Sequence, residues 1–297
     1  MYGNLFYEKG LSLDRLKCLL EVADAGSIVK AADRDPVKQS QFSRQIKELE
    51  AYFKCELTQR VGKSLKLTRE GKELVSIIRG NFIALNEFKS NQNLTVREVS
   101  IGAGDSILQW TLIPMLSKLK QEFPDVKYSL HNLRSKEINN KLSDLSLDIG
   151  IVRKESVVEP LSSTDLTNLD FLLYAPKTLI PLKKRNDVKW ILSEIPIATQ
   201  VGAAFHKQLL EVFSNTSHRL NIELNCESYT QAYQALKSKC YAAILPSNID
   251  SDINIDDYIK LDLPVKTKLR SLVLAYNTRM ISMKPYLEKI VQSMSSY

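Results

Sequence analysis

The hydrophobic period of the chain changes near residue 96, and this change limits the possible folds more than any other feature. Before it, apolar residues recur at the three-and-four spacing of amphipathic helices; after it, strand-like runs alternate with helical ones. Val126, Tyr128 and Leu130 alternate as in a strand, and residues 138–145 follow with helical spacing. A repeated order of strand, helix and strand predicts a parallel sheet covered by helices.

The strand and helix patterns after residue 94 fall into two sets. The first covers residues 94–154 and the second covers 155–269, while a last strand and helix at 270–297 return to the first. A stretch of this length fits two α/β subdomains better than one sheet. The sequence therefore predicts subdomain I over 94–154 and 270–297, and subdomain II over 155–269.

Residues 1–70 predict short helices and one hairpin. Gly26 is expected to end the first helix, since glycine readily adopts the left-handed conformation of a helix end. A break at Asp35-Pro36 precedes a third helix at about 39–52, because the residue before a proline avoids the helical region. The turn expected at residues 61–64 joins two short strands.

One long helix is expected from residue 68 to about 91, and we assign residues 71–93 to a linker and dimerisation helix between the domains. Its apolar residues form a coiled-coil-like seam: Val75, Ile78, Phe82, Leu85 and Phe88. Such a seam can pack on its own domain or pair with a second copy of the chain. The position of the helix between two domains favours pairing, so we predict a homodimer or a tetramer.

Positive charge is concentrated near the N-terminus. The chain has a net charge of +7, and residues 30–72 contain eleven Lys or Arg side chains against six Asp or Glu. Charge placed so unevenly indicates a module that binds a polyanion, although a solvated basic face would have the same composition.

The third helix carries two different faces. Its apolar stripe consists of Phe42, Ile46, Leu49 and Phe53. The opposite face and the start of the helix carry polar and basic residues: Gln39, Ser40, Gln41, Ser43, Arg44 and Lys47. Arg can donate two hydrogen bonds to guanine, Gln can pair with adenine, and Ser suits phosphate oxygens. This face fits the major groove of DNA; an ordinary amphipathic helix is the alternative.

Residues 26–50 resemble the winged helix-turn-helix of LysR-type transcriptional regulators. The family pattern has paired alanines, a turn, Gln, a variable pair, an apolar residue and Ser-Arg-Gln. Here these are Ala31, Ala32, Gln39, Phe42, Ser43, Arg44 and Gln45. Residues 57–71 resemble the family's wing and linker entry, and segments 113–114, 123–126, 147–152 and 243–246 are similar to landmarks of its effector domain. The resemblance thus covers nearly the whole chain.

Two positions depart from the family pattern. Asp35 stands where a leucine is usual in the turn, and Ser40 stands where a proline is common. Asp can still serve as a turn residue before Pro36. The motif is therefore expected to persist while its base contacts differ.

The resemblance implies a fold and a set of partners. The fold would be a winged helix-turn-helix over residues 1–70, the linker helix, and an effector domain of two periplasmic-binding-protein-like subdomains over 94–297. Operator DNA would meet the third helix and the wing, where Lys63 and Lys66 are expected to contact the backbone. A small effector would bind between the subdomains. Positions similar to the family's effector contacts are Asp105, Ser106, Ser135, Thr199 and Gln200.

The residues themselves are compatible with an effector site there. Ser106 to Gln109 has the spacing of a capping box, and ligands of α/β sheets gather where strand ends meet helix N-termini. The same polar residues could equally be helix caps and nothing more. Asp105 could select a cationic or hydroxyl-rich ligand.

Other classes of protein fit the sequence less well. An enzyme is not indicated, because no P-loop, nucleophile elbow or HExxH motif occurs, and we expect no cofactor and no metal. No secretory signal or membrane span is visible, so a cytoplasmic location is expected. A sequence-independent architectural DNA binder and a cytoplasmic ligand-binding protein remain as alternatives to a regulator.

Overall fold

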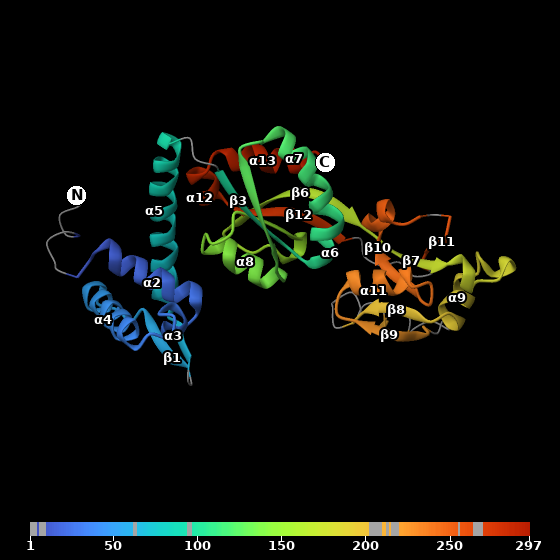
Figure 1. Cartoon of the computed structure of the whole chain (residues 1–297), viewed down its shortest axis with the longest axis horizontal. Helices are drawn as coiled ribbons and strands as arrows, with labels where there is room; N and C mark the ends of the chain where they lie inside the picture. Colours follow the sequence, from blue (N-terminus) through green and yellow to red (C-terminus); the bar gives the residue numbers. More distant parts are fainter. Residues whose placement is uncertain are drawn as a thin grey trace.

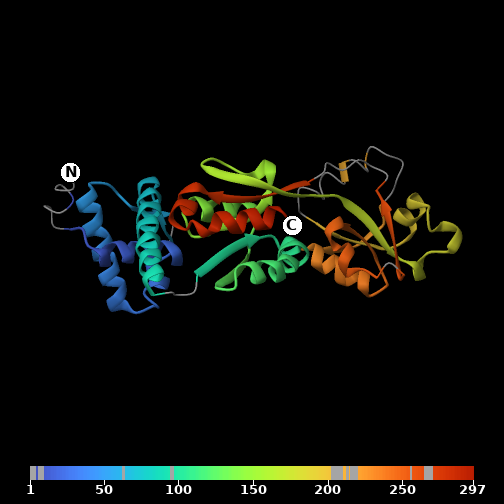
Figure 2. The same ribbon diagram turned by 90° about the horizontal axis from the view of Figure 1, so that it is seen from above.

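The computed structural model describes residues 5, 10–61, 64–93, 97–201, 210–211, 214, 220–254, 256–263 and 270–297. Three parts follow one another along its longest axis, as Figure 1 and Figure 2 show from two directions. We call them the N-terminal domain, the first α/β body and the second α/β body. Helix α5 (Arg69–Asn93) stands between the N-terminal domain and the first α/β body.

The N-terminal domain contains the three helices and the hairpin that the sequence predicts. They are α2 (Leu13–Ala25), α3 (Ile28–Ala31), α4 (Pro36–Phe53), β1 (Thr58–Val61) and β2 (Ser64–Leu67). The two strands pair antiparallel. Leu19 and Leu49 are fully buried between the helices, and Val75 and Ile78 of α5 complete this core. Burial of these side chains seats α4 with its apolar stripe inward and its polar face outward.

Helix α4 begins at Pro36, so the predicted start near Gln39 is wrong. Asp35 is the N-cap: its Oδ1 accepts hydrogen bonds from the backbone N–H groups of Val37, at 2.8 Å, and Lys38, at 3.5 Å. Pro36 occupies the first helical position, where a missing N–H costs nothing. The unusual Asp35 therefore starts the helix instead of interrupting it, and adds a turn before Gln39.

Helix α5 leaves the hairpin through a close backbone contact. Thr68 caps it by accepting from the Gly71 N–H at 3.0 Å, while its own hydroxyl donates to the Glu56 carbonyl at 2.7 Å. A Cβ atom at Gly71 would lie 2.0 Å from the Leu57 carbonyl oxygen, a distance much shorter than a van der Waals contact. Position 71 therefore requires glycine.

The apolar seam of α5 divides into two halves. Val75 and Ile78 are buried in the core of the N-terminal domain, and Phe82 packs against it. Leu85 and Phe88 are 59% and 68% exposed. Packing within the chain thus accounts for the first half of the seam and leaves the second half open.

The first α/β body is a five-stranded sheet in the order β4-β3-β5-β12-β6. Its strands are β3 (Arg97–Ala103), β4 (Val126–Asn132), β5 (Ile149–Arg153), β6 (Leu161–Leu169) and β12 (Arg270–Asn277). The predicted parallel order holds for β3, β4 and β5, whereas β12 runs antiparallel to both of its neighbours. Its helices include α7 (Ile113–Glu122), α8 (Ser135–Ser143), α12 (Thr278–Met283) and α13 (Tyr286–Ser295).

The second α/β body is also a five-stranded sheet, in the order β11-β7-β10-β8-β9. Its strands are β7 (Phe171–Pro176), β8 (Ile197–Gln200), β9 (Ile222–Cys226), β10 (Ala242–Pro246) and β11 (Tyr258–Asp262). Helices α9 (Val188–Glu194) and α11 (Tyr229–Lys237) belong to this body. The helix expected at 203–214 lies mostly outside the described residues.

The chain passes between the bodies later than the sequence suggests. Strand β6 pairs with β12, Leu161 opposite Asn277 and Leu169 opposite Arg270, and so belongs to the first sheet. The predicted change of subdomain at 154/155 is therefore wrong, and the chain crosses between Leu169 and Phe171. The pairing of β6 with β12 decides to which body β6 belongs. The alternation of apolar and polar residues along a strand shows which face is buried but does not identify the strand beside it.

Replacing Asp35 by Ala should destabilise the start of α4. The lost side-chain cap is worth about 0.5–2 kcal/mol, and Asp35→Asn should retain most of it because Asn is an equally good cap. Hydrogen exchange of the α4 amides measures this as a lower free energy of opening. Equal protection in Asp35→Ala and the parent would mean that Pro36 and core packing alone start the helix.

Candidate nucleic-acid interface and effector site

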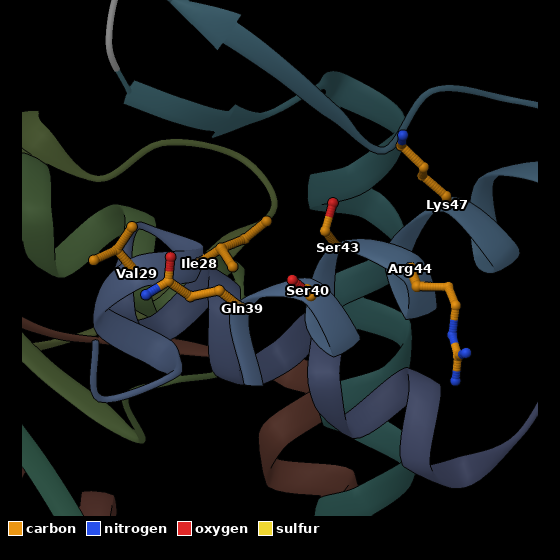
Figure 3. Close-up of a pocket in the computed structure, with 7 residues that line it drawn as sticks. All are labelled: Ile28, Val29, Gln39, Ser40, Ser43, Arg44 and Lys47. Atoms are coloured by element: carbon orange, nitrogen blue, oxygen red, sulfur yellow. The ribbon is translucent and has the colours of Figure 1, made fainter. Parts of the chain in front are cut away.

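An open pocket lies on the outer face of α4 (Figure 3). It is lined by Ile28 and Val29 of α3 and by five residues of α4: Gln39, Ser40, Ser43, Arg44 and Lys47. All five belong to the predicted DNA-binding set. The structure therefore brings most of that set onto one surface.

The remaining residues of the set lie elsewhere. Gln41 is exposed on α4 outside the pocket, and Lys66 is exposed on β2. Lys63 lies outside the described residues.

The polar face of α4 points outward because the opposite side of the helix is held in the core. Ile46 and Leu49 are 2% and 0% exposed, and the Phe42 carbonyl accepts the Cys18 thiol at 3.8 Å. Positions 40, 43, 44 and 47 then face away from α2, as the helical period of 3.6 residues requires. The predicted division of α4 into two faces is confirmed.

Arg44 is tethered at one end of this surface. Its Nε lies 3.7 Å from Glu48 Oε1 one turn along the helix, and Glu48 also pairs with Arg15 of α2. The Arg44 side chain remains 75% exposed. Figure 3 shows it pointing away from Gln39, which lies at the other side of the pocket. An exposed pair of this kind is weak, so the guanidinium is free to exchange Glu48 for a stronger acceptor.

The hairpin is fixed to α4 by one carboxylate. Glu50 Oε1 accepts from the N–H groups of Leu57 and Thr58 at 2.9 and 3.0 Å, and from the Thr58 hydroxyl at 3.1 Å. These bonds hold the start of β1 against the end of α4. The basic wing is thereby positioned beside the helix.

Sequence reasoning missed the contribution of α3. Val29 is 49% exposed on the rim of the pocket, beside Ile28. An exposed β-branched residue can contact a thymine methyl group, which is apolar. Helix α3 has four residues, too few for its hydrophobic period to indicate which side faces outward.

The predicted effector residues come from both bodies. Asp105 begins the short helix α6 (Asp105–Ile107) of the first body, and its Oδ2 accepts the Thr230 hydroxyl of α11 in the second body. Thr199 is 1% exposed at the end of β8, and the neighbouring Gln200 donates to the Glu227 carbonyl at 2.9 Å. The structure thus places Asp105 at the junction and Thr199 and Gln200 on the second body.

The two serines both lie at the start of a helix, but Ser106 does not cap its helix as the sequence predicts. Gly104 is the N-cap of α6, so the prediction that Ser106 caps a helix is wrong; Ser106 lies inside the first turn. Residues 228–231 have the same capping-box spacing, and there Ser228 does cap a helix: its hydroxyl accepts from Gln231 N–H at 3.2 Å at the start of α11. Ser135 is the first residue of α8, after Arg134.

A second set of contacts joins the bodies, and sequence reasoning missed all of it. Trp110, in the π-helical turn η1 (Leu108–Leu112), packs in the core of the second body, edge-on to Tyr233 with ring centroids 5.6 Å apart. Beside it, Asn248 Nδ2 donates to Thr111 Oγ1 at 2.8 Å. Trp110 Nε1 and Asn248 Oδ1 are buried without a hydrogen bond to the described residues. The junction therefore combines apolar packing with unused polar atoms.

Among the residues that the structure describes, no three His, Cys, Asp or Glu side chains lie close enough together to hold a metal ion. No helix among these residues combines the length and apolar character needed to cross a membrane.

Comparison with known proteins matches both parts of this architecture. Residues 13–72 match the family described as bacterial regulatory helix-turn-helix protein, lysR family, and residues 92–289 match the LysR substrate binding domain. The HTH-type transcriptional regulator TdcA of Escherichia coli (strain K12) is 24% identical over 293 residues, which is 93% of this chain and 91% of the relative.

Two solved structures share the fold over almost the whole chain. A full-length OxyR variant from Pseudomonas aeruginosa superposes with a TM-score of 0.70 at 16% identity, covering 97% of this chain and 95% of that one. Full-length CbnR, solved in complex with its target DNA, superposes with a TM-score of 0.56 at 17% identity, covering 92% and 98%.

Fold and site together define a DNA-binding regulator with a winged helix-turn-helix and a two-body ligand domain. The chain belongs to the LysR family of transcriptional regulators, with a DNA-binding domain at its N-terminus and an effector-binding domain after the linker helix.

Proposed function

We propose that this regulator binds operator DNA as a dimer or a higher oligomer, through α4 and the wing, in the cytoplasm. A small polar effector bound between the two α/β bodies changes that binding, and no catalysis is involved. The observation that carries the proposal is the gathering of Gln39, Ser40, Ser43, Arg44 and Lys47 on one outward face of α4.

The chemistry of the α4 surface supports sequence-specific contact with a major groove. Ser40 and Ser43 are short, so the helix can approach base edges closely, and Gln39 and Arg44 offer paired donors. Lys66 on the wing carries a charge that suits the sugar-phosphate backbone. Glu50 keeps the two parts in one arrangement, so both can reach the same duplex.

The open half of the α5 seam supports self-association. Leu85 and Phe88 are large apolar side chains more than half exposed on one helix, and Ile77 is 45% exposed. Exposed apolar residues at coiled-coil spacing are stabilised when a second copy of the helix covers them. Two copies joined through α5 would present two α4 surfaces to two half-sites of DNA.

The junction of the bodies supports the effector site. Asp105 supplies a carboxylate at this junction, and Trp110 Nε1 and Asn248 Oδ1 supply an unused donor and an unused acceptor. A polar ligand that meets such groups there would favour one arrangement of the bodies over another. Its effect on DNA binding then follows from the different affinities of the two arrangements for the ligand.

Arg44→Ala should weaken binding to operator DNA by about 1–3 kcal/mol and relax the preference at one base position, as expected for a base contact. Lys66→Gln is the matched comparison: it should lower the salt slope of log K by about one unit and leave base preference unchanged. Anisotropy titrations on operator and scrambled duplexes measure both.

Two outcomes would contradict these expectations. If Arg44→Ala loses equal affinity for the two duplexes, Arg44 contacts a phosphate and not a base. If the parent protein binds both duplexes equally, it is a sequence-independent architectural DNA binder.

Phe88→Asp should shift the chain toward the monomer and weaken operator binding, because it would place a charge in a covered apolar seam. Phe88 is 68% exposed within one chain, so this change leaves the monomer's own core intact, whereas Phe82 packs against that core. Sedimentation velocity measures the mass. Lys89→Asp, on the same helix, is the control for an added negative charge. A parent that is already monomeric would contradict the proposal.

Asp105→Asn should weaken the effector by about tenfold, the value expected for one charge-assisted hydrogen bond. A thermal-shift screen of polar metabolites on the parent identifies a ligand, and titration of that ligand then compares the variants. Asp125→Asn, exposed before β4, is the matched control and should bind like the parent. Unchanged affinity in Asp105→Asn and in Thr230→Val would place the effector away from this junction.

A further inference from the structure

A separate cavity of about 490 Å³ lies between helix α5 and the first α/β body. We call it the joint cavity. Its lining comes from α5, from the start of β3 and from the end of α12: Arg79, Phe82, Ile83, Asn86, Glu87, Arg97, Glu98 and Lys284. It shares no residue with the junction of the two α/β bodies.

Two of the three cations in this lining already have partners. Arg79 binds Asp24 of α2 through both terminal nitrogens, at 2.7 and 3.4 Å. Lys284 Nζ lies 2.9 Å from Asp148 Oδ1, and this pair is almost fully buried. These pairs hold the cavity's walls in place and leave little charge for a ligand.

The third cation, Arg97, is differently placed. Its guanidinium lies over the ring of Tyr286, 5.0 Å from the centroid, and forms no ion pair with any residue that the structure describes. Stacking on an aromatic face leaves the edge of the guanidinium, with its N–H donors, open to a carboxylate.

Glu87 is the corresponding anion. Its side chain is half-buried and has no ion pair among the described residues. Burial, and to a lesser degree Asp148, raise the pKa of its carboxyl, while Lys284, Arg97 and a hydrogen bond with Tyr286 act in the opposite direction. Tyr286 is its hydrogen-bond partner. A carboxylate has lone pairs for more than one donor, so this half-buried group can still accept from a bound cation, which would stabilise its charge.

The floor between these two charges is apolar. Phe82 packs against the core of the N-terminal domain, and Ile83 packs against the core of the first α/β body. Both side chains are partly buried, so they present a surface that an aliphatic group can cover.

We propose that the joint cavity binds a small zwitterion with an apolar side chain, of the amino-acid class. The ammonium group of the ligand meets Glu87, its carboxylate meets Arg97, and its side chain covers Phe82 and Ile83. The volume is within the range of small-molecule sites. A simple anion would leave Glu87 without a cation, and a simple cation would leave Arg97 without an anion. A ligand that carries both charges and an apolar group is therefore expected to bind more tightly than either.

The position of this site makes it a second point of control. α5 carries the N-terminal domain, and it approaches the first body closely: a Cβ at Gly80 would lie 3.3 Å from Leu145 Cδ1 and 3.4 Å from an Arg279 terminal nitrogen. A ligand that touches both α5 and β3 would favour one angle between them. The inference does not depend on an effector between the α/β bodies.

Calorimetric titration of the full chain with L-leucine tests the proposal. The parent should bind it, whereas isocaproate, which lacks the ammonium group, and isoamylamine, which lacks the carboxylate, should each bind at least about tenfold more weakly. Glu87→Gln and Arg97→Gln should each weaken L-leucine by about tenfold. Alanine, valine, methionine and phenylalanine extend the probe set to other side-chain sizes.

Two control variants make the result specific. Lys89→Gln removes a charge from an exposed position on the same helix outside the cavity, and should bind like the parent. Asp105→Asn alters the junction of the α/β bodies, and should also leave this affinity unchanged. Circular dichroism of each variant verifies that the chain is folded, so that a loss of affinity reports on the site.

Three results would overturn the proposal. They are no binding of any of these amino acids at millimolar concentration, equal affinity for L-leucine and its two truncated analogues, or a loss of affinity in Asp105→Asn but not in Glu87→Gln. Each leaves the proposed DNA interface untouched, since operator binding is measured separately.

Discussion

The packing of α5 on two different cores is the constraint on which the rest of this structure depends. Val75 and Ile78 complete the core of the N-terminal domain, and Ile83 packs toward the first α/β body. Gly71 and Gly80 allow the close approaches at these two contacts. Because one rigid helix takes part in both, any change in its angle to the body moves the α4 surface as a unit.

The junction of the two α/β bodies uses a different kind of contact. Trp110 leaves its own body and packs beside Tyr233, so separating the bodies would expose a large aromatic surface. Asp105 and Thr111 add polar contacts at the same place. In the proposed mechanism, a ligand at this junction would favour one arrangement of the two bodies over another. On that proposal, control of DNA binding would pass from the junction through the first body to α5.

Much of the N-terminal domain was predictable, because its information is local. The stripe of Phe42, Ile46 and Leu49 determines which face of α4 is outward, and the five lining residues follow from that face. The start of α4 was not predicted, since Asp35 serves both as a turn residue and as a cap, and only the hydrogen bonds to Val37 and Lys38 distinguish these roles. The effector residues were located only as far as strand and helix ends, and Ser106 proved not to be a cap.

The sequence by itself determined the change to alternating strands and helices, the outward face of α4 and membership of the LysR family, because hydrophobic period and motif spacing are properties of neighbouring residues. It did not predict strands β6 and β11. Tertiary structure decided which strand pairs with which, and so moved the crossing between bodies to Asp170. It also decided that Trp110 packs in the second body and that Glu87 and Arg97 face one cavity. These are contacts between residues distant in the chain, and their energies depend on burial and geometry that no local pattern encodes.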